Sequence, residues 1–174
     1  MSGLAAGATL VLYDGSPFYP DGHALFDLVD QEQIAIFATS AKYIDALNKG
    51  GFEPARSHEL GSLRTILSTG SPLVPESYDY VYESIKSDVC LSSIAGGTDI
   101  VSCFIAGAPL LPVWRGELQC AGLGMAVEIW NDAGHAVVGE KGELVCTKPF
   151  PSMPVGFWND PDGSRYHQAY FDRF

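Results

Sequence analysis

Hydrophobic and polar positions between residues 63 and 99 predict a strand, a helix and a second strand. Residues 63–68 form a short apolar run, and residues 69–72 (Thr-Gly-Ser-Pro) then carry strong turn chemistry. Residues 89–94 (Val-Cys-Leu-Ser-Ser-Ile) are interpreted as the next buried strand, and they lead into residues 96–99 (Gly-Gly-Thr-Asp). The helix is indicated by an apolar stripe at i, i+3, i+4 and i+7, made of Tyr78, Val81, Tyr82 and Ile85. We interpret the stretch as a βαβ unit, whose two strands should be parallel with a right-handed crossover.

The chain upstream of this unit continues the alternation of strands and helices. Apolar runs predict buried strands over residues 9–13 and 34–38, and helical patterns cover residues 23–30 and 41–47. Residues 1–8 are rich in small side chains and resemble the end of a helix. The expected caps and inward-facing residues are Asp21, Leu25, Leu28, Val29, Ser40, Ile44, Leu47 and Gly50-Gly51. This order predicts a doubly wound, mostly parallel sheet with flanking helices.

The pattern changes after Cys103, where helical stripes give way to short β-like segments. Three segments read as strands: residues 113–119, 125–130 and 143–147. Residues 131–134 (Asn-Asp-Ala-Gly) are typical of a hairpin turn, and residues 149–163 should form an ordered loop. We therefore predict a parallel α/β core over residues 1–103, followed by a small antiparallel β-subdomain and C-terminal loop over residues 104–174.

Composition and charge narrow the functional classes. The 174 residues are 47% hydrophobic and 18% charged, which is typical of a globular chain. The net charge of −11, with only ten Lys and Arg, argues against nucleic acid or an anionic membrane surface as a partner. Four separated cysteines without Cys-x-x-Cys or Cys/His ligand spacing favour reduced, buried thiols in the cytoplasm over a zinc site or disulfide framework.

Candidate chemistry lies where the two strands of the βαβ unit end. Ligands of open parallel sheets bind beyond the carboxyl ends of the strands, so the loops at 69–72 and 95–99 should share one crevice. A bare Gly-Gly backbone, the Thr98 hydroxyl and the Asp99 carboxylate suit a nucleotide phosphate with magnesium. On pattern alone, the same four residues are also consistent with a tight turn that contains an Asx-type hydrogen bond.

Several segments resemble the adenylate-forming superfamily of acyl-CoA synthetases, and within it the branch that activates acetoacetate. The similarity covers nearly the whole chain. It is carried by LSTGSPL at 67–73, SSIAGGTDIVSCF at 92–104, the segment from GMAVEIW to GFWND at 124–160, and YHQAYF at 166–171. The resemblance implies an acid–thiol ligase that joins acetoacetate and ATP into an acyl-adenylate and then transfers the acyl group to CoA.

The resemblance also assigns roles to individual residues. It implies that Thr98 contacts the phosphate and that Asp99 helps to hold Mg²⁺. Most relatives carry Glu at the latter position, so the shorter Asp allows a water-bridged contact. The residues matching the nucleotide-binding positions are Gly70, Ser71, Pro72, Ser93, Ile94, Ala95 and Gly97.

A second group of residues matches the acyl pocket, namely Thr39, Thr69 and Gly96. Several relatives carry aromatic residues where Ala95 and Gly96 stand here, and small residues leave room for a four-carbon acid. The alternative for the two threonines is that they simply cap the ends of strands.

The superfamily's phosphate loop, ribose-binding Asp and catalytic Lys domain have no counterpart in this sequence. We therefore expect a middle fragment of a longer enzyme, inactive by itself. Two alternatives stay open: a synthetase for another short acid, and a non-catalytic fragment that binds a partner or self-associates through exposed apolar surface.

Neither the histidines nor the C-terminal aromatic residues suggest a separate active site. The sequence contains no G-x-S-x-G motif, and none of the histidines has a Ser or Cys partner at a recognisable motif, so a Ser-His-Asp hydrolase is disfavoured. The histidines are His23, His58, His135 and His167. We expect the aromatic cluster Phe157, Trp158, Tyr166, Tyr170 and Phe171 to serve packing.

Overall fold

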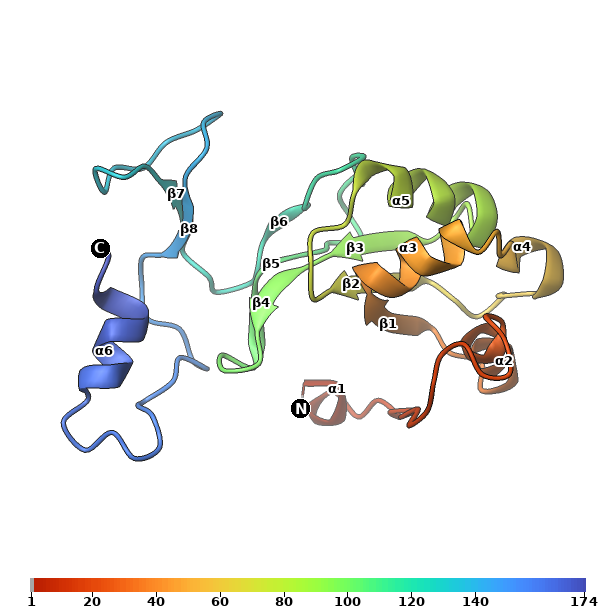
Figure 1. Ribbon diagram of the computed structural model, residues 1–174, viewed down its shortest axis with the longest axis horizontal. Coiled ribbons are helices and arrows are strands. Elements are labelled where there is room, and N and C mark those ends of the chain that lie inside the picture. Colours follow the sequence, from red (N-terminus) through yellow and green to blue (C-terminus); the bar gives the residue numbers. More distant parts are fainter. Residues whose placement is uncertain (1) are drawn as a thin grey trace. The chain divides into compact units, whose positions relative to one another are not determined.

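The computed structural model describes residues 2–174, and it is a mixed α/β structure (Figure 1). The helices are α1 (Ser2–Ala5), α2 (Ala24–Gln31), α3 (Ala41–Lys49), α4 (Pro54–Ser57), α5 (Pro75–Tyr80), the π-helix η1 (Val81–Ile85) and α6 (Ser164–Phe171). The strands are β1 (Ile36–Ser40), β2 (Thr65–Thr69), β3 (Cys90–Ser93), β4 (Ala95–Gly97), β5 (Ser102–Ala106), β6 (Cys120–Ala121), β7 (Val127–Trp130) and β8 (Glu143–Cys146). The helix end expected over residues 1–8 corresponds to α1, and Met1 lies outside the described residues.

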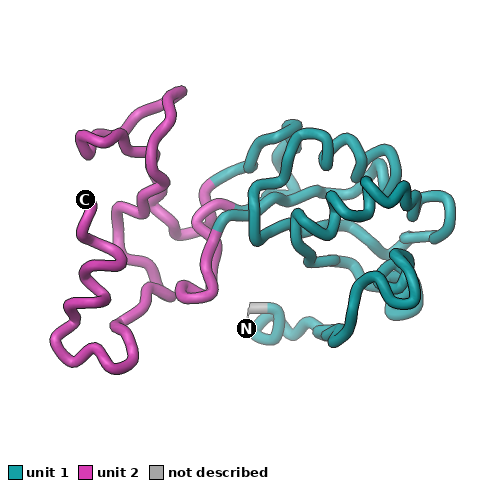
Figure 2. The backbone as a smooth tube through the Cα atoms, in the orientation of Figure 1, with its two compact units in different colours: residues 1–95, 106–120 teal, residues 96–105, 121–174 magenta. Residues whose placement is uncertain are grey.

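The chain divides into two compact units (Figure 2). Unit 1 comprises Met1–Ala95 and Ala106–Cys120, and unit 2 comprises Gly96–Ile105 and Ala121–Phe174. The boundary that the sequence predicts at residue 103 falls inside β5. The division into residues 1–103 and 104–174 stays a prediction.

Unit 1 is built on a parallel sheet with the strand order β1-β2-β3, which confirms the predicted βαβ unit. The predicted stripe forms the buried face of the α5–η1 helix: Tyr78, Val81 and Ile85 are buried, and Tyr82 is half-buried. Helices α3 and α5 pack together on one face of the sheet (Figure 1). Their apolar sides form one core with α2 and the sheet, which includes Phe26, Ile44, Leu47, Ile66 and Leu91.

Unit 2 contains the antiparallel pair β7–β8, in which Val127 pairs with Cys146 and Trp130 with Glu143. The predicted turn at 131–134 is present, since Asn131 N donates to His135 O at 2.9 Å and Gly134 has φ +75°. The strands β4, β5 and β6 form a further three-stranded sheet in that order. One end residue of each of these strands (Ala95, Ala106 and Cys120) is assigned to unit 1. The small β-subdomain is thereby confirmed as a fold feature.

Two predicted strands are wrong. Residues 9–13 form no strand, and Leu10, Val11, Leu12 and Tyr13 are exposed. An apolar run becomes a strand only where its backbone groups find a partner, and within the described residues this run has none.

The second wrong strand, 113–119, is a looped segment held by side chains. Gly116 has φ +81°, which breaks the extended conformation. The Gln119 side chain donates to the carbonyl oxygens of Leu111 (3.1 Å) and Pro112 (3.3 Å) and accepts from Ala108 N (3.1 Å). Hydrogen bonds from a single amide thus replace a strand ladder.

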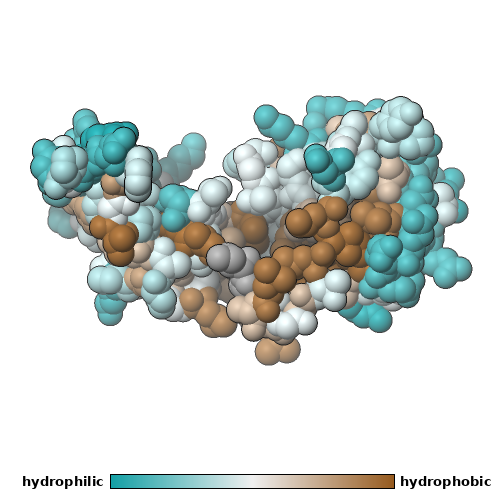
Figure 3. Space-filling view, turned by 90° about the horizontal axis from the view of Figure 1, so that it is seen from below, coloured by the Kyte–Doolittle hydropathy of each residue, from teal (hydrophilic) through white to brown (hydrophobic). Residues whose placement is uncertain are grey.

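Some expectations about burial are also corrected. β1 begins two residues later than predicted, and Ile36 is 59% exposed, so this strand is not buried. Figure 3 shows apolar residues gathered over unit 1 on the face seen there.

Helix α2 also differs from the prediction in its buried residues. These are Phe26 and Val29, whereas Leu25 and Leu28 are only half-buried. The predicted cap Asp21 does not accept from an amide inside α2. Its carboxylate accepts from the backbone N of His23, the residue before the helix, at 2.8 Å.

Helix α6 lies where the sequence predicts only loop. Its first turn is held by Asp160, which accepts from Arg165 N (3.1 Å) and Tyr166 N (2.8 Å). Asp162 accepts from Ser164 N (3.1 Å), and that bond holds the pKa of the Asp162 carboxyl below its usual range. The signal in the sequence is the pair of acidic residues directly before the helix.

None of the helices formed by residues 2–174 is long and apolar enough to cross a membrane.

Candidate functional site

The carboxyl ends of the three parallel strands bring the predicted unit 1 residues to one edge of the sheet. Ser40 pairs with Thr69 in the β1–β2 register, and Ser68 pairs with Ser93 in the β2–β3 register. Thr39 pairs with Ser68 and therefore lies one step from the end of β2. The structure thus brings Thr39, Thr69 and Ser93 to neighbouring strand ends.

The loop that leaves β2 exposes mainly backbone at this edge. Gly70 has φ +84°, a left-handed conformation that favours glycine, and Pro72 is exposed. Ile94 N donates to Ser68 O at 2.9 Å, which ties the residue after β3 to the end of β2. The Ser68 hydroxyl is buried and has no hydrogen-bond partner among the described residues.

The Gly-Gly-Thr-Asp motif belongs to unit 2 and forms the end of β4 and the turn before β5. Thr98 and Asp99 are exposed, and Val101 N donates to Thr98 O at 3.3 Å. A Cβ atom on Gly96 would collide with the carbonyl oxygen of Ser102. Gly96 is therefore required by the close approach of two strands, quite apart from any pocket.

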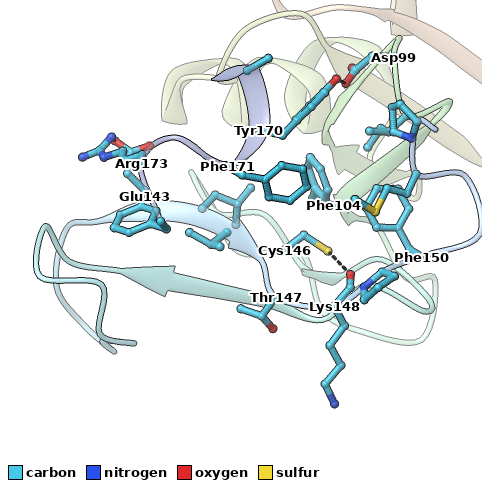
Figure 4. Close-up of a pocket in the computed structure, with 18 of the residues that line it drawn as sticks. Asp99, Phe104, Glu143, Cys146, Thr147, Lys148, Phe150, Tyr170, Phe171 and Arg173 are labelled. Carbon is cyan, nitrogen blue, oxygen red and sulfur yellow. Dashed lines mark hydrogen bonds and ion pairs between the residues drawn. The ribbon is translucent and has the colours of Figure 1, made fainter. Parts of the chain in front are cut away.

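The Asp99 carboxylate has a partner that the sequence did not indicate. The Tyr170 hydroxyl in α6 donates to Asp99 Oδ2, as Figure 4 shows. This bond to a carboxylate raises the pKa of Tyr170 to about 12. The alternative predicted from the sequence, an Asx-type bond, does not describe this contact. An Asx-type bond joins Asp99 to a nearby backbone amide, whereas Tyr170 lies 71 residues away in the chain.

Tyr170 and Asp99 lie at an apolar cavity of about 560 Å³ within unit 2 (Figure 4). Phe104, Phe150 and Phe171 point into it, and Cys146 donates to Lys148 O at 3.5 Å on its wall. Packing is confirmed for four of the five predicted aromatic residues: the Tyr170 ring centroid lies 5.2 Å from Tyr166, 5.7 Å from Phe157 and 6.3 Å from Phe171. It is wrong for Trp158, which is 90% exposed. Tyr170 combines this packing with a polar contact that composition alone does not reveal.

A second polar cluster lies in unit 1, where Ser57 and Asp27 flank His58. Ser57 Oγ is 2.8 Å from His58 Nδ1, and His58 Nε2 is 3.0 Å from Asp27 Oδ1. The His58 side chain is only 5% exposed. The order Ser-His-Asp resembles a nucleophile with its base. Ser57 and His58 are sequence neighbours at the end of α4, however, and the bonds join that end to α2.

The described residues contain no group of three or more His, Cys, Asp or Glu side chains that could hold a metal ion alone. A lone exposed carboxylate is nevertheless compatible with Mg²⁺, which in nucleotide sites is usually held by one or two carboxylates together with substrate phosphates. Asp99 fits that arrangement as a contributor, not as part of a complete protein cage.

Known proteins are similar to this chain over most of its length. The profile of the AMP-binding enzyme family matches residues 1–156. The acetoacetyl-coenzyme A synthetase of Rhizobium meliloti (strain 1021) is 69% identical over 173 residues, which are 99% of this chain and 27% of that protein. The acetoacetyl-CoA synthetase of Xenopus tropicalis is 54% identical over 174 residues, covering 100% of this chain and 26% of that protein.

Among solved structures, acetoacetyl-CoA synthetase from Streptomyces lividans superimposes with a TM-score of 0.91 at 45% identity. The match covers 99% of this chain and 27% of that one, so the chain spans about a quarter of the length of the relatives it matches. Because the family profile covers residues 1–156 of 174, the chain belongs to the AMP-binding enzyme family.

Proposed function

We propose that this chain is part of an acid–thiol ligase that activates acetoacetate with ATP and passes the acyl group to CoA. The observation that carries the proposal is the 69% identity, over nearly the whole chain, to a protein called acetoacetyl-coenzyme A synthetase. The use of ATP and CoA is proposed from the family match and from the same relatives. The particular acid and Mg²⁺ are proposals from the resemblance.

The proposed phosphate side of the site consists of Thr98 and Asp99. Their exposure supports this role, since both side chains are accessible to a ligand. Asp99 would hold Mg²⁺, and the ion when bound offsets phosphate charge. Thr98 would orient the phosphate through its hydroxyl, so both residues work by positioning and by charge stabilisation and neither transfers a proton.

The proposed nucleotide and acyl sides lie at the strand ends. The nucleotide-binding set is Gly70, Ser71, Pro72, Ser93, Ile94, Ala95 and Gly97, and the acyl set is Thr39, Thr69 and Gly96. The shared sheet edge of Thr39 and Thr69 supports their assignment to one pocket. The close contact of Gly96 with β5 supports a structural reason for glycine there, so its pocket role rests on resemblance alone.

The wider assignments are proposed on the same basis. Residues 1–103 would form the parallel core of the adenylate-forming large domain and residues 104–174 its β-subdomain. We propose a cytoplasmic location, which the four free cysteines support. All four are half-buried, so the predicted full burial of these thiols is wrong. By itself the chain should not turn over, because it spans only about a quarter of the length of the synthetases that it resembles.

The proposal is tested by calorimetric titration of the chain with a non-hydrolysable acetoacetyl-adenylate analogue, with and without Mg²⁺. Asp99→Ala should weaken binding only when Mg²⁺ is present. Glu140→Ala, which removes a charge from an exposed loop of the same unit, is the control and should bind like the wild type. Absence of binding at millimolar ligand, or an equal effect of Asp99→Ala without Mg²⁺, would contradict the proposal. Competition with other short acyl-adenylates separates acetoacetate from another acid.

A second candidate, self-association, is favoured by the exposed apolar surface of unit 1 (Figure 3). Ile36 of β1 is 59% exposed, although parallel sheets are normally covered on both faces. Light scattering distinguishes this candidate: a mass that rises with protein concentration supports a homo-oligomer, and a constant monomer mass excludes it.

A further inference from the structure

The Asp99 carboxylate has a different neighbour at each of its two oxygen atoms. Oδ2 accepts the hydrogen bond from the Tyr170 hydroxyl (Figure 4). Oδ1 lies so close to Gly97 that a Cβ atom on that glycine would collide with it. An ionised carboxylate only accepts hydrogen bonds, so the phenol is the donor in this pair. The hydrogen bond from Tyr170 thereby favours one orientation of an exposed side chain, and the missing side chain of Gly97 leaves room for it.

Tyr170 is itself held in place by its surroundings. Its ring packs against Tyr166 and Phe157, with centroids 5.2 Å and 5.7 Å away. Asp160 fixes the start of α6 through the backbone amides of Arg165 and Tyr166. Because these ring contacts already restrict the Tyr170 side chain, its hydroxyl can hold the carboxylate at a small entropic cost.

We infer that Tyr170 is a positioning residue that orients the Asp99 carboxylate for its phosphate and magnesium role. The role in holding phosphate and magnesium rests on the proposed function. The contact between Tyr170 and Asp99 is observed independently of that function. Gly97 acts only by leaving space for Oδ1, whereas the Tyr170 hydroxyl attracts Oδ2. Loss of the hydroxyl should release Asp99 without changing its charge.

The first test is structural and needs no ligand. In chain labelled with ¹³C at the Asp carboxyl carbon, the Asp99 resonance is assigned by its loss in Asp99→Asn. Tyr170→Phe should shift this resonance. Tyr166→Phe is the matched control: it removes a hydroxyl from the same helix, one that donates to Pro154 O at 2.6 Å instead of to Asp99. The control should leave the Asp99 resonance in place.

The second test measures binding of the adenylate analogue by calorimetry. Tyr170→Phe should weaken the Mg²⁺-dependent part by about tenfold, the usual effect of losing a hydrogen bond to a charged group. Binding without Mg²⁺ should stay unchanged, as should both parts in Tyr166→Phe. A general loss of folding would weaken binding with Mg²⁺ and binding without Mg²⁺ alike. The difference between the two therefore separates a positioning role from an effect on stability.

The outcomes distinguish the inference from the function on which it rests. An Asp99 resonance unchanged in Tyr170→Phe, or moved equally by Tyr166→Phe, overturns the inference. So does Mg²⁺-dependent binding that Tyr170→Phe leaves intact. If the wild-type chain binds no analogue, the proposed function fails for this chain, and the resonance alone decides whether Tyr170 positions Asp99.

Discussion

At the residue scale, Gly96 marks a point where two strands approach too closely for a side chain. We expect Gly96→Ala to destabilise the chain by about 1–3 kcal/mol, the usual cost of overpacking, because the new methyl group would meet the backbone of Ser102 and Cys103. The measurement is the free energy of unfolding from urea titration followed by circular dichroism.

Gly61→Ala is the matched control for this prediction. Gly61 has no neighbouring heavy atom within 4 Å of a Cβ position, and its φ is not in the left-handed region. The same chemical change should therefore leave stability unchanged or raise it slightly. An equal loss of stability in both variants would contradict the strand-contact explanation.

The contrast between Thr39 and Tyr170 shows which site residues a sequence can reveal. Parallel strands end at one edge, so a pattern that predicts two such strands also predicts that Thr39 and Thr69 lie close together. The partner of Asp99 is 71 residues away on a helix that the pattern did not predict. Tyr170 could not be distinguished from its aromatic neighbours, because packing and hydrogen bonding use the same side chain.

At the element scale, Ser40 both ends β1 and caps α3. Its side chain accepts from Tyr43 N at 3.1 Å, as the sequence predicted. Ser40→Ala should cost about 1 kcal/mol of stability, because it leaves that helix amide without its partner. Ser40→Asn retains an acceptor and should lose much less. Urea unfolding measures both, and equal losses would contradict the capping role.

The loop at 113–119 is joined to α5 by a pair whose strength depends on pH. Arg115 Nε lies 2.9 Å from both carboxylate oxygens of Asp79 and holds the pKa of that carboxyl below its usual range. A depressed folded pKa gives stability that is present above the unfolded pKa and is lost as pH falls through the folded pKa.

We therefore expect the wild type to lose more stability than Asp79→Asn when the pH falls below about 4. The effect should be small because both side chains are exposed, and added salt should reduce it. Urea unfolding at a series of pH values provides the measurement. Parallel stability curves for the two proteins would show that the pair contributes nothing.

The elements that the sequence predicted well are those whose own residues determine them. The α5–η1 stripe and the Ser40 cap follow from local periodicity and local hydrogen bonding. Residues 9–13 and 113–119 have strand-like composition, but a strand also requires a neighbour, and a single sequence does not specify one. Helix α6 was missed because its aromatic residues suggested packing and its acidic cap was read as part of a loop.

At the scale of the whole chain, burial is distributed very unevenly. The apolar core cluster lies in unit 1 and includes Phe26, Leu47 and Val81, whereas Ile100 is the single buried residue of unit 2 within the described part of the chain. We expect backbone amides of unit 2 to exchange with solvent deuterium faster than those of the β1-β2-β3 sheet, by about tenfold or more.

Hydrogen–deuterium exchange with mass spectrometry of peptic fragments tests this expectation. The β7–β8 pair is the informative comparison, since its amides are hydrogen-bonded in a ladder as those of the parallel sheet are. Protection of β7–β8 equal to that of β2 would mean that both units unfold as one cooperative body.

The chain passes between the two units three times, after Ala95, Ile105 and Cys120. Neither unit is therefore encoded by one uninterrupted stretch of a gene. A single recombination crossover at any position would transfer part of a unit without its remainder. Exchange of a whole unit within this chain would need crossovers at all three passages, so a single event cannot move it.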